Sequence, residues 1–400
     1  MANQNTHYEL FSDGGLARTV YSRKEFRVRD NEKGMWRFLD WLPGRRSLPV
    51  GFGSVSFRSE ALAATLGLAN LYIAFSGYWP EKKAYNMTCD FKDLEAAATI
   101  SKLREDGIPS VSVISAGNTA RAFAFLSSLV DIEVRILIPE DAVDQMWIPC
   151  VPGDKIILMP VEGMNYSETI RIGGVFFTED TKPQIGAYNI ARRDGIGTIL
   201  LEAVTVMGHL PDHYFQPIGS GIGAVAAFEA SERLIQDGRF GKEFPHLHLS
   251  QNAPFTPVHS AWSRQSRQID PELDMPDANT AIKGIMADVL SNKNPLYSMK
   301  RGLYDCLTRT GGFTYGITNE DALSASKLIS EKEGIDFMPP VGVCVASLIQ
   351  SIEQGNVDRN DTILLNATGG GVKRLSADYQ IYPIKPVCRV NVHDLEKELF

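Results

Sequence analysis

A loop with residues suited to binding a carboxylate follows the strand-like run "VSVI". It consists of Ser115, Ala116, Gly117, Asn118 and Thr119, and a helix-like stretch comes directly after it. Backbone N–H groups at such a helix start can hold a carboxylate or another oxyanion. An ordinary turn, with Asn118 or Thr119 capping the helix, would need the same residue types.

A second loop, in "FQPIGSGIGAVAAFEA", contains Gly219, Ser220, Gly221, Ile222 and Gly223. Glycine lets the backbone approach an anion closely, and the helix that follows adds its positive end. A dinucleotide site would also need an acidic residue at the end of the next strand, but that run ends "HLSQN". The loop therefore fits a compact phosphate cup better, and a tight turn without a ligand is the alternative.

A third loop begins at Thr368, which ends the strand-like run "DTILLNAT" and precedes three consecutive glycines. A hydroxyl at this position can contact a bound ring, and the glycines leave the approach to it open. A flexible glycine turn with no ligand is equally compatible with this pattern.

Lys92 stands at the start of a predicted helix, "LEAAATISKL", between Asp90 and Asp93. The helix dipole repels a cation at this position, so the lysine needs an explanation. For an isolated lysine the ordinary explanation is a solvated surface side chain.

The elements that must position these residues alternate between strand-like and helix-like runs from about residue 70. Such alternation predicts right-handed crossovers and largely parallel sheets, whose carboxyl ends are where ligands bind. We expect the less regular first ~70 residues to wrap one domain, and the polar stretch 263–280 to form a loop.

The composition argues against several classes of function. With 40 Lys and Arg against 48 Asp and Glu, the net charge is −8, which argues against non-specific binding to nucleic acid or anionic membranes. The five cysteines are far apart and favour a reducing compartment, and the seven histidines lack metal-binding spacing. There is no signal-like start, and no apolar run approaches the ~20 residues of a membrane span. We therefore expect a cytoplasmic protein without a metal.

The combination of these motifs resembles the pyridoxal-phosphate enzymes of the tryptophan-synthase-β type, known as fold type II. "FK", "SAGNT" and "GSGIG" are the strings that carry the cofactor class, pyridoxal 5'-phosphate. Longer strings, among them "RFLDWLP", "LYIAFSGYWPEK", "FKDLEA" and "LLNATGGGVKR", resemble the threonine synthase branch. Within it the chain most closely resembles the cysteate synthases of methanogenic archaea, from about residue 35 to 375.

This resemblance implies an α/β fold of two domains, each a mostly parallel sheet flanked by helices. Residues 1–75 and 186–400 would form the large cofactor-binding domain and residues 76–185 the small domain, with the cofactor in the cleft between them. Relatives of this fold are commonly homodimers, so we expect a homodimer here.

The resemblance also implies a role for each loop. Lys92 would be the catalytic residue and would hold the cofactor as a Schiff base, which explains a lysine at a helix start. Asn118 would bond the ring oxygen, the segment from Gly219 to Gly223 would hold the phosphate, and Thr368 would face the pyridine nitrogen. The loop from Ser115 to Thr119 would bind the substrate carboxylate.

The reaction implied is a β-replacement on O-phospho-L-serine with sulfite as the nucleophile, giving L-cysteate and phosphate. It would pass through a Lys92 aldimine and an aminoacrylate. Threonine synthase, which acts on O-phosphohomoserine, and β-replacement with a different nucleophile are alternatives. A non-catalytic cofactor-binding relative is disfavoured by the intact set of Lys92, Asn118 and Thr368.

Two departures from the family pattern are visible. The segment "HYELFSDGGLARTVYS" lacks the cysteines of a metal ribbon, and Ala120 replaces a usual glycine.

Anionic substrates also need a local cationic subsite, for which we favour Arg121 because Arg binds oxyanions well through two parallel hydrogen bonds. The other candidates are Lys82, Lys83, Arg192, Arg193, Lys373 and Arg374.

Overall fold

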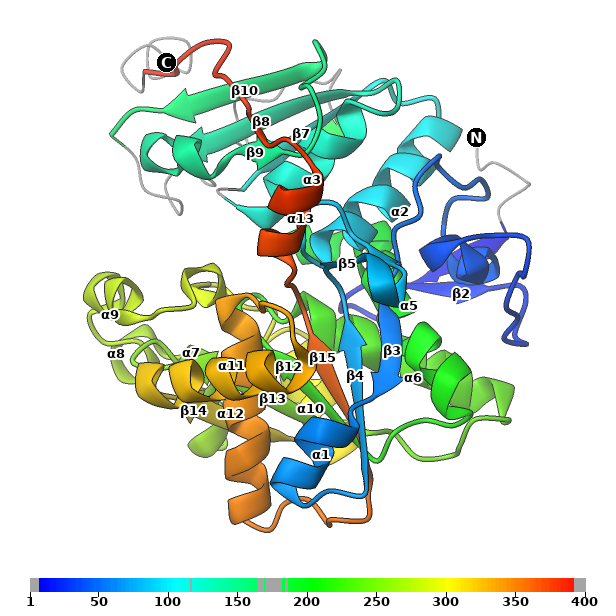
Figure 1. Ribbon diagram of the computed structural model, residues 1–400, viewed down its shortest axis with the longest axis vertical. Coiled ribbons are helices and arrows are strands. Elements are labelled where there is room, and N and C mark those ends of the chain that lie inside the picture. Colours follow the sequence, from blue (N-terminus) through cyan, green and yellow to red (C-terminus); the bar gives the residue numbers. More distant parts are fainter. Residues whose placement is uncertain (1–6, 116, 164–168, 170–181, 184–185, 392–400) are drawn as a thin grey trace.

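The computed structural model describes residues 7–115, 117–163, 169, 182–183 and 186–391 (Figure 1). Its α-helices are α1 (Glu60–Leu66), α2 (Lys92–Glu105), α3 (Asn118–Ser127), α5 (Ile190–Met207), α6 (Ile222–Asp237), α7 (Pro257–Ser263), α8 (Pro271–Asp274), α9 (Ala278–Gly284), α10 (Leu303–Thr310), α11 (Asn319–Glu333), α12 (Pro339–Glu353) and α13 (Val372–Asp378). Short 3-10 helices are η1 (Gly34–Trp41), η2 (Pro80–Lys82), η3 (Glu140–Gln145), η4 (Gly186–Tyr188) and η5 (Asp288–Leu290).

The larger sheet has six strands in the order β14-β13-β12-β15-β4-β3. These strands are β14 (Phe313–Ile317), β13 (His246–Asn252), β12 (His213–Pro217), β15 (Thr362–Ala367), β4 (Asn70–Phe75) and β3 (Val55–Arg58). Neighbours are parallel except β3, which runs antiparallel to β4 at the edge. Every residue of β12 and β15 is buried, as expected for parallel strands covered by helices on both faces.

The smaller sheet has four parallel strands in the order β10-β8-β7-β11, and it lies at the top of Figure 1. These strands are β10 (Ile156–Val161), β8 (Glu133–Pro139), β7 (Ser110–Ile114) and β11 (Lys182–Pro183). The two sheets confirm the predicted α/β architecture with mostly parallel strands.

Helices α2 and α5 connect the two sheets. Helix α2 packs on α3 and on α5, and α5 packs in turn on α6, β3 and β4. The approach between α2 and α5 is close, because a Cβ atom at Gly195 would collide with the carbonyl oxygen of Leu94. The lysine-bearing helix is therefore fixed against the framework of the larger sheet.

The remaining segments surround this framework. An antiparallel pair, β1 (Tyr8–Phe11) and β2 (Arg18–Tyr21), lies near the N-terminus. The stretch 263–280, predicted to be a loop, instead contains α8 and the start of α9. That prediction was wrong because it overlooked Asp274, whose buried carboxylate accepts hydrogen bonds from Ser260 and Arg264 and so stabilises compact structure.

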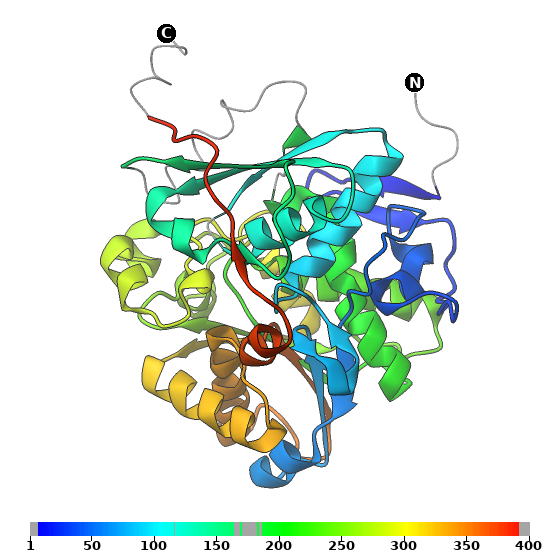
Figure 2. The same cartoon turned by 45° about the horizontal axis from the view of Figure 1, so that its top comes forward.

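The C-terminal part of the chain returns from the larger to the smaller sheet, as the red segment in Figures 1 and 2 shows. Strand β16 (Tyr382–Pro383) pairs antiparallel with β9 (Trp147–Ile148), and Val390 bridges Val161. A further short pair, β5 (Tyr78–Trp79) and β6 (Ala84–Tyr85), lies between β4 and α2 in the chain.

Candidate active site

Strands β12, β15 and β4 are adjacent and parallel, so the loops after them emerge at one edge of the larger sheet. Near this edge the Asn366 amide donates to Oε1 of Gln216 at 2.6 Å, and the backbone N–H of Ser76 donates to the Ala367 carbonyl at 3.0 Å. The loop that starts at Gly219 and the loop that starts at Thr368 are therefore neighbours.

The segment just before Lys92 is bonded to the same edge. The Phe91 N–H donates to the Thr368 carbonyl at 2.9 Å, and the Gly370 N–H donates to the Cys89 carbonyl at 3.0 Å. Glycine is needed here, because a Cβ atom at Gly369 would lie 2.7 Å from the Cys89 carbonyl oxygen. This pairing brings Lys92 and Thr368, 276 positions apart in the numbering, into one site.

Lys92 is the first residue of α2, and acidic side chains in the first turn compensate its charge. Its Nζ lies 3.1 Å from Oε2 of Glu95, and the Lys92 side chain is 18% exposed against 0% for Glu95. Nζ also lies over the Phe91 ring, 4.4 Å from its centroid. The lysine is thus a half-buried, paired side chain and not a freely solvated one.

Two further carboxyl groups near Lys92 are buried. Burial raises the pKa of Asp90 to about 6 and that of Asp93 to about 7, against the partial compensation of their hydrogen bonds and of nearby cations. Asp90 accepts from the Lys92 backbone N–H at 2.9 Å, while Asp93 accepts from both the N–H and the hydroxyl of Thr88. These bonds shape the turn that presents the lysine.

The start of α3, which follows β7 in the chain, is tied to the lysine segment by two side chains. Asn118 Nδ2 donates to Oδ2 of Asp90 at 2.6 Å, and the Thr119 hydroxyl donates to Oε1 of Glu95 at 2.8 Å. Ser115 and Gly117 are half-buried and lie between β7 and α3. Ala116 lies outside the described residues.

The glycine loop ends at the N-terminus of α6. Gly221 has a φ of +83° and precedes the helix without a side-chain cap, and the first turn has no acidic residue. The Leu296 N–H donates to the Ser220 carbonyl at 2.9 Å, which holds the loop in place. The loop also packs closely on Gln216, because a Cβ atom at Gly223 would lie 2.7 Å from Nε2 of Gln216. Ile222 is the first residue of α6. This helix start can accept an anion.

Arg121 is buried, with 7% of its surface exposed. Its guanidinium lies 4.3 Å from the centroid of the Trp147 ring, and one Nη donates to Oδ1 of Asn118. Its Nε is buried without a hydrogen-bond partner in the described part of the chain. Burial lowers the pKa of Arg121, against the opposing effect of Asp90.

The other cations proposed from the sequence have different surroundings. Arg192 is buried and donates to Glu95, whereas Arg193 pairs with Glu229 at 3.0 Å. Lys82 lies over the Phe57 ring at 3.9 Å. Arg374 is more exposed and pairs with acidic side chains, while Lys83 and Lys373 do not appear in any ion pair of the described residues.

Sequence reasoning missed Glu95 and the buried carboxyl groups of Asp90 and Asp93. A signal for Glu95 was present, because residues three apart on a helix are neighbours and Glu95 follows Lys92 at that spacing. No signal in the sequence indicated that Arg192, 97 positions later, would share the same carboxylate.

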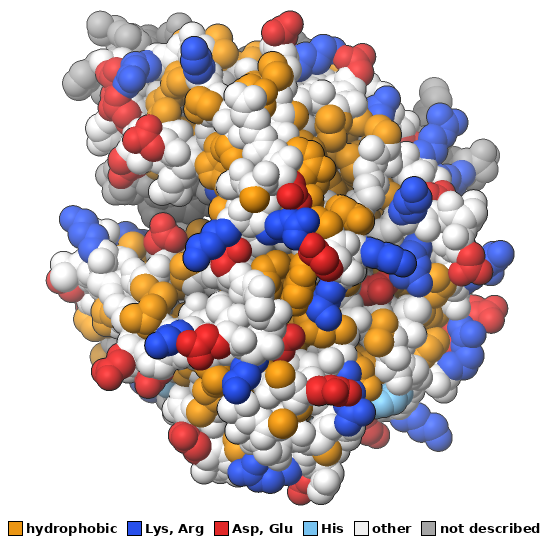
Figure 3. All heavy atoms as spheres, in the orientation of Figure 1, with side chains coloured by type: hydrophobic (Ala, Val, Ile, Leu, Met, Phe, Trp, Pro, Cys, Tyr) orange, Lys and Arg blue, Asp and Glu red, His pale blue; other side chains and the backbone are white. Residues whose placement is uncertain are grey.

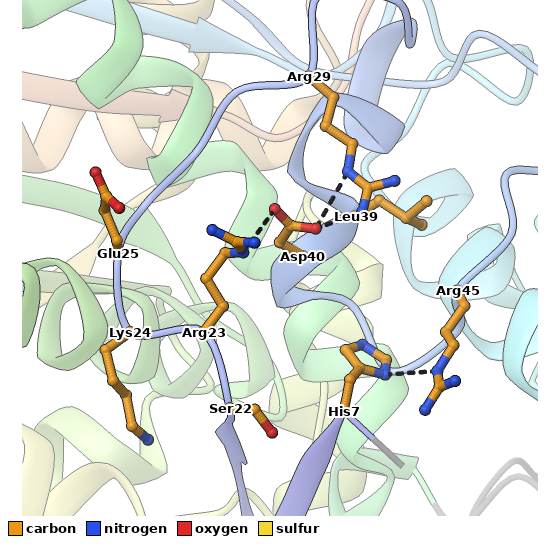
Figure 4. Close-up of a pocket in the computed structure, with 9 residues that line it drawn as sticks. All are labelled: His7, Ser22, Arg23, Lys24, Glu25, Arg29, Leu39, Asp40 and Arg45. Carbon is orange, nitrogen blue, oxygen red and sulfur yellow. Dashed lines mark hydrogen bonds and ion pairs between the residues drawn. The ribbon is translucent and has the colours of Figure 1, made fainter. Parts of the chain in front are cut away.

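A hollow of about 740 Å³ lies elsewhere, beside the N-terminal segment (Figure 4). Figure 4 shows Arg23 and Arg29 converging on Asp40, and His7 facing Arg45. These charges are engaged with one another, and the hollow contains none of the site residues predicted from the sequence. On the face shown in Figure 3, acidic and basic side chains are interspersed.

The residues gathered at the sheet edge fit pyridoxal phosphate. Lys92 supplies an amine on a partly exposed side chain, the first turn of α6 supplies backbone N–H groups and has no acidic residue, and the buried Thr368 hydroxyl makes no hydrogen bond within the described residues. In the described ranges no group of three or more His, Cys, Asp or Glu side chains could hold a metal ion. Among the described helices, none is long and apolar enough to cross a membrane.

Curated proteins with similar sequences include cysteate synthases. The chain is 45% identical over 386 residues to the cysteate synthase of Methanosarcina barkeri, covering 96% of this chain and 92% of that protein. It is 46% identical over 376 residues to that of Methanoculleus marisnigri, covering 94% and 87%.

Solved structures with the same fold are more distant in sequence. Maize serine racemase superimposes with a TM-score of 0.58 at 16% identity, covering 81% of this chain and 91% of that one. A threonine deaminase from Solanum lycopersicum gives a TM-score of 0.57 at 17% identity, covering 81% of this chain and 87% of that one.

Residues 74–369 match the family described as pyridoxal-phosphate dependent enzyme. The chain therefore belongs to the pyridoxal-phosphate dependent enzymes and has their fold type II architecture.

Proposed function

We propose that this enzyme is a cysteate synthase, which replaces the phosphate of O-phospho-L-serine with sulfite to give L-cysteate and phosphate. The observation that carries the proposal is the 45% identity to a cysteate synthase along nearly the whole of both chains. The gathering of Lys92, Asn118 and Thr368 at one sheet edge supports it.

Pyridoxal phosphate, when bound, withdraws electrons from the Cα atom of an attached amino acid. Its phosphate would lie at the N-terminus of α6, where Gly219, Ser220, Gly221, Ile222 and Gly223 offer backbone N–H groups and no competing acid. Thr368 would face the ring nitrogen, and Asn118 would donate to the ring oxygen.

Lys92 would carry the cofactor and move the substrate proton. Its amine, once released by the incoming amino acid, would take the proton from Cα onto Nζ and return it to Cα after sulfite has added at Cβ. The phosphate leaves with the electrons of the Cβ–O bond, and the C–S bond forms from the sulfite lone pair. The Ser115–Thr119 loop would bind the substrate carboxylate through its backbone.

Arg121 would contribute positive charge to the anion subsite. Its burial against Trp147 and its unpartnered Nε support this role, because a desolvated guanidinium interacts strongly with an oxyanion. The substrates would be a small anionic amino acid and a small nucleophile, with no nucleic acid or membrane as partner.

We also propose the division into a large domain of residues 1–75 and 186–400 and a small domain of residues 76–185. The described strands of the two parallel sheets follow this division, with β16 reaching back to the smaller unit.

We further propose that the enzyme is a homodimer and that it is located in the cytoplasm. Five free cysteine thiols support a reducing compartment.

The test is to incubate the purified, cofactor-loaded enzyme with O-phosphoserine and sulfite and to measure released phosphate and cysteate. O-phosphohomoserine without sulfite is the parallel arm. Cysteate at an enzymatic rate supports the proposal. Threonine formed from phosphohomoserine, with no cysteate in the first arm, would assign the enzyme to the threonine synthase reaction, and no turnover in either arm would indicate a different reaction or a non-catalytic relative.

A further inference from the structure

Glu95 contacts three polar side chains at once, although its own side chain is completely buried. Its Oε2 lies 3.1 Å from Nζ of Lys92. Its Oε1 accepts from the Thr119 hydroxyl at 2.8 Å and from the guanidinium of Arg192. One carboxylate therefore connects the lysine on α2, the first turn of α3 and the arginine on α5.

The partners of Glu95 favour the ionised form of its carboxylate. Burial by itself would raise its pKa, but Arg192 and Lys92, together with the hydrogen bonds from Arg192 and Thr119, bring the pKa below its usual value. A buried carboxylate that loses its counter-charges is costly, so Arg192 is what allows Glu95 to remain charged beside the lysine.

The amine of Lys92 has few contacts in the described part of the chain. Glu95 is its only hydrogen-bond acceptor there, and the Phe91 ring covers it from one side. When the amine takes a proton from a substrate it becomes an ammonium in a half-buried position. Such a cation needs a nearby negative charge if the proton is to stay on Nζ until it is returned.

We propose that Glu95 is a positioning residue that holds the free amine of Lys92 in the site and stabilises its ammonium form, while its second oxygen fixes the position of Thr119, in the first turn of α3, relative to the lysine. This inference rests on the proposed assignment of Lys92 as the cofactor-bearing residue. It adds a pair, Glu95 and Arg192, that touches the reaction only through Lys92 and Thr119.

The chain offers a matched control in the neighbouring pair Arg193 and Glu229. Both side chains are buried and lie 3.0 Å apart, and Arg193 directly follows Arg192 on α5. Within the part of the chain that the structure describes, Glu229 makes no hydrogen bond or ion pair with Lys92. Glu229→Gln therefore removes a buried carboxylate beside an arginine without changing the surroundings of the lysine.

The first experiment measures how readily Lys92 reacts in the full-length chain freed of cofactor. Trace acetylation at a series of pH values, read by peptide mass spectrometry, gives the pH midpoint at which the amine becomes reactive, with the other lysines as internal references. In Glu95→Gln we expect this midpoint to fall by about one pH unit or more, because a carboxylate within 4–6 Å favours the charged amine. In Glu229→Gln it should not move.

The second experiment uses the cofactor-loaded enzyme and the pH profile of kcat. The acidic limb should move to lower pH in Glu95→Gln, and kcat should fall more than KM for the amino acid rises. If Glu95→Gln does not fold, the double variant Glu95→Gln, Arg192→Gln removes the unpaired buried cation and is tested in the same way.

An unchanged midpoint for Lys92 in a folded Glu95 variant would overturn the inference, and so would an equal shift in Glu229→Gln. This failure is distinguishable from failure of the proposed function, because trace acetylation uses neither phosphoserine nor sulfite. If borohydride reduction attached the cofactor to another lysine, the assignment of Lys92 itself would be the part that fails.

Discussion

Asn118 donates from Nδ2 to Oδ2 of Asp90 at 2.6 Å, while its own Oδ1 accepts from Arg121. An amide group has one donor end and one acceptor end, so these two contacts fix which end faces the lysine segment. The donor end is therefore turned toward the residues beside Lys92, and it is the end that the proposed bond to a ring oxygen would use.

Lys92→Ala should fold and form no covalent link to the cofactor, because the side chain that can form an imine is gone. The measurement is borohydride reduction followed by peptide mass spectrometry, with turnover measured in parallel. Lys82→Ala, which removes a lysine that lies over Phe57, is the control and should retain the link. A cofactor tag on a different lysine in the wild-type enzyme would contradict the assignment.

Thr368→Ala should bind the cofactor but lose most activity, because the hydroxyl proposed to face the ring nitrogen is missing. Thr368→Ser keeps that hydroxyl and should recover much of the rate. Absorbance spectra of the bound cofactor and kcat for the two variants check this expectation. Equal rates and identical spectra for Thr368→Ala and the wild type would place the hydroxyl away from the cofactor.

Gly221→Ala should destabilise the protein and weaken cofactor binding. The left-handed backbone at φ +83° costs a non-glycine residue about 1–2 kcal/mol, and the added Cβ would also collide with the Leu303 side chain. Gly208→Ala is the matched control, with φ +80° and open space around its Cβ. Urea unfolding should show the larger loss for Gly221→Ala, and equal losses would mean that Leu303 moves aside freely.

Arg121→Met should impair use of the phosphorylated substrate, since a charge-assisted hydrogen bond lost in a buried site costs about 1.5–3 kcal/mol. The check is kcat/KM with O-phosphoserine compared with O-acetylserine, which lacks the phosphate. We expect a loss of at least about tenfold for the former and a smaller one for the latter. Equal losses would indicate that Arg121 acts through Asn118 and not on the anion.

The buried carboxyl group of Asp93 should make the protein less stable as the pH rises from about 4 to 7. Burial raises its folded-state pKa to about 7, whereas in the unfolded chain it ionises near 3.9. In this window the folded state holds a proton that the unfolded state has released, so stability is greatest on the acidic side and falls with increasing pH.

Replacing Asp93 by Asn should flatten this dependence, because Asn can still accept from the Thr88 N–H without ionising. Urea unfolding at pH 5, 6, 7 and 8 measures the slope, and the exposed Asp154→Asn is the control. A slope in Asp93→Asn as steep as that of the wild type would show that Asp93 is not the titrating group.

The sequence by itself determined the fold class and the loops of the site. Alternating runs such as "NLYIAFS" and "DTILLNAT" carry the local signature of buried parallel strands, and they form β4 and β15 as neighbours. The alternation also placed the loops of Gly219 and Thr368 at carboxyl ends of strands, where ligands bind, but their meeting at one edge depends on the pairing of β12 with β15.

Only the tertiary structure decided the electrostatics of the site. Arg192 and Glu95 are separated by 97 positions and become partners because α5 packs closely on α2, where Gly195 permits the approach. Arg121, for which a helix-surface position is the ordinary expectation from sequence, is buried against Trp147. The energy of a charge depends on its burial and on partners brought from distant segments, and neither quantity is encoded in the residue types next to it.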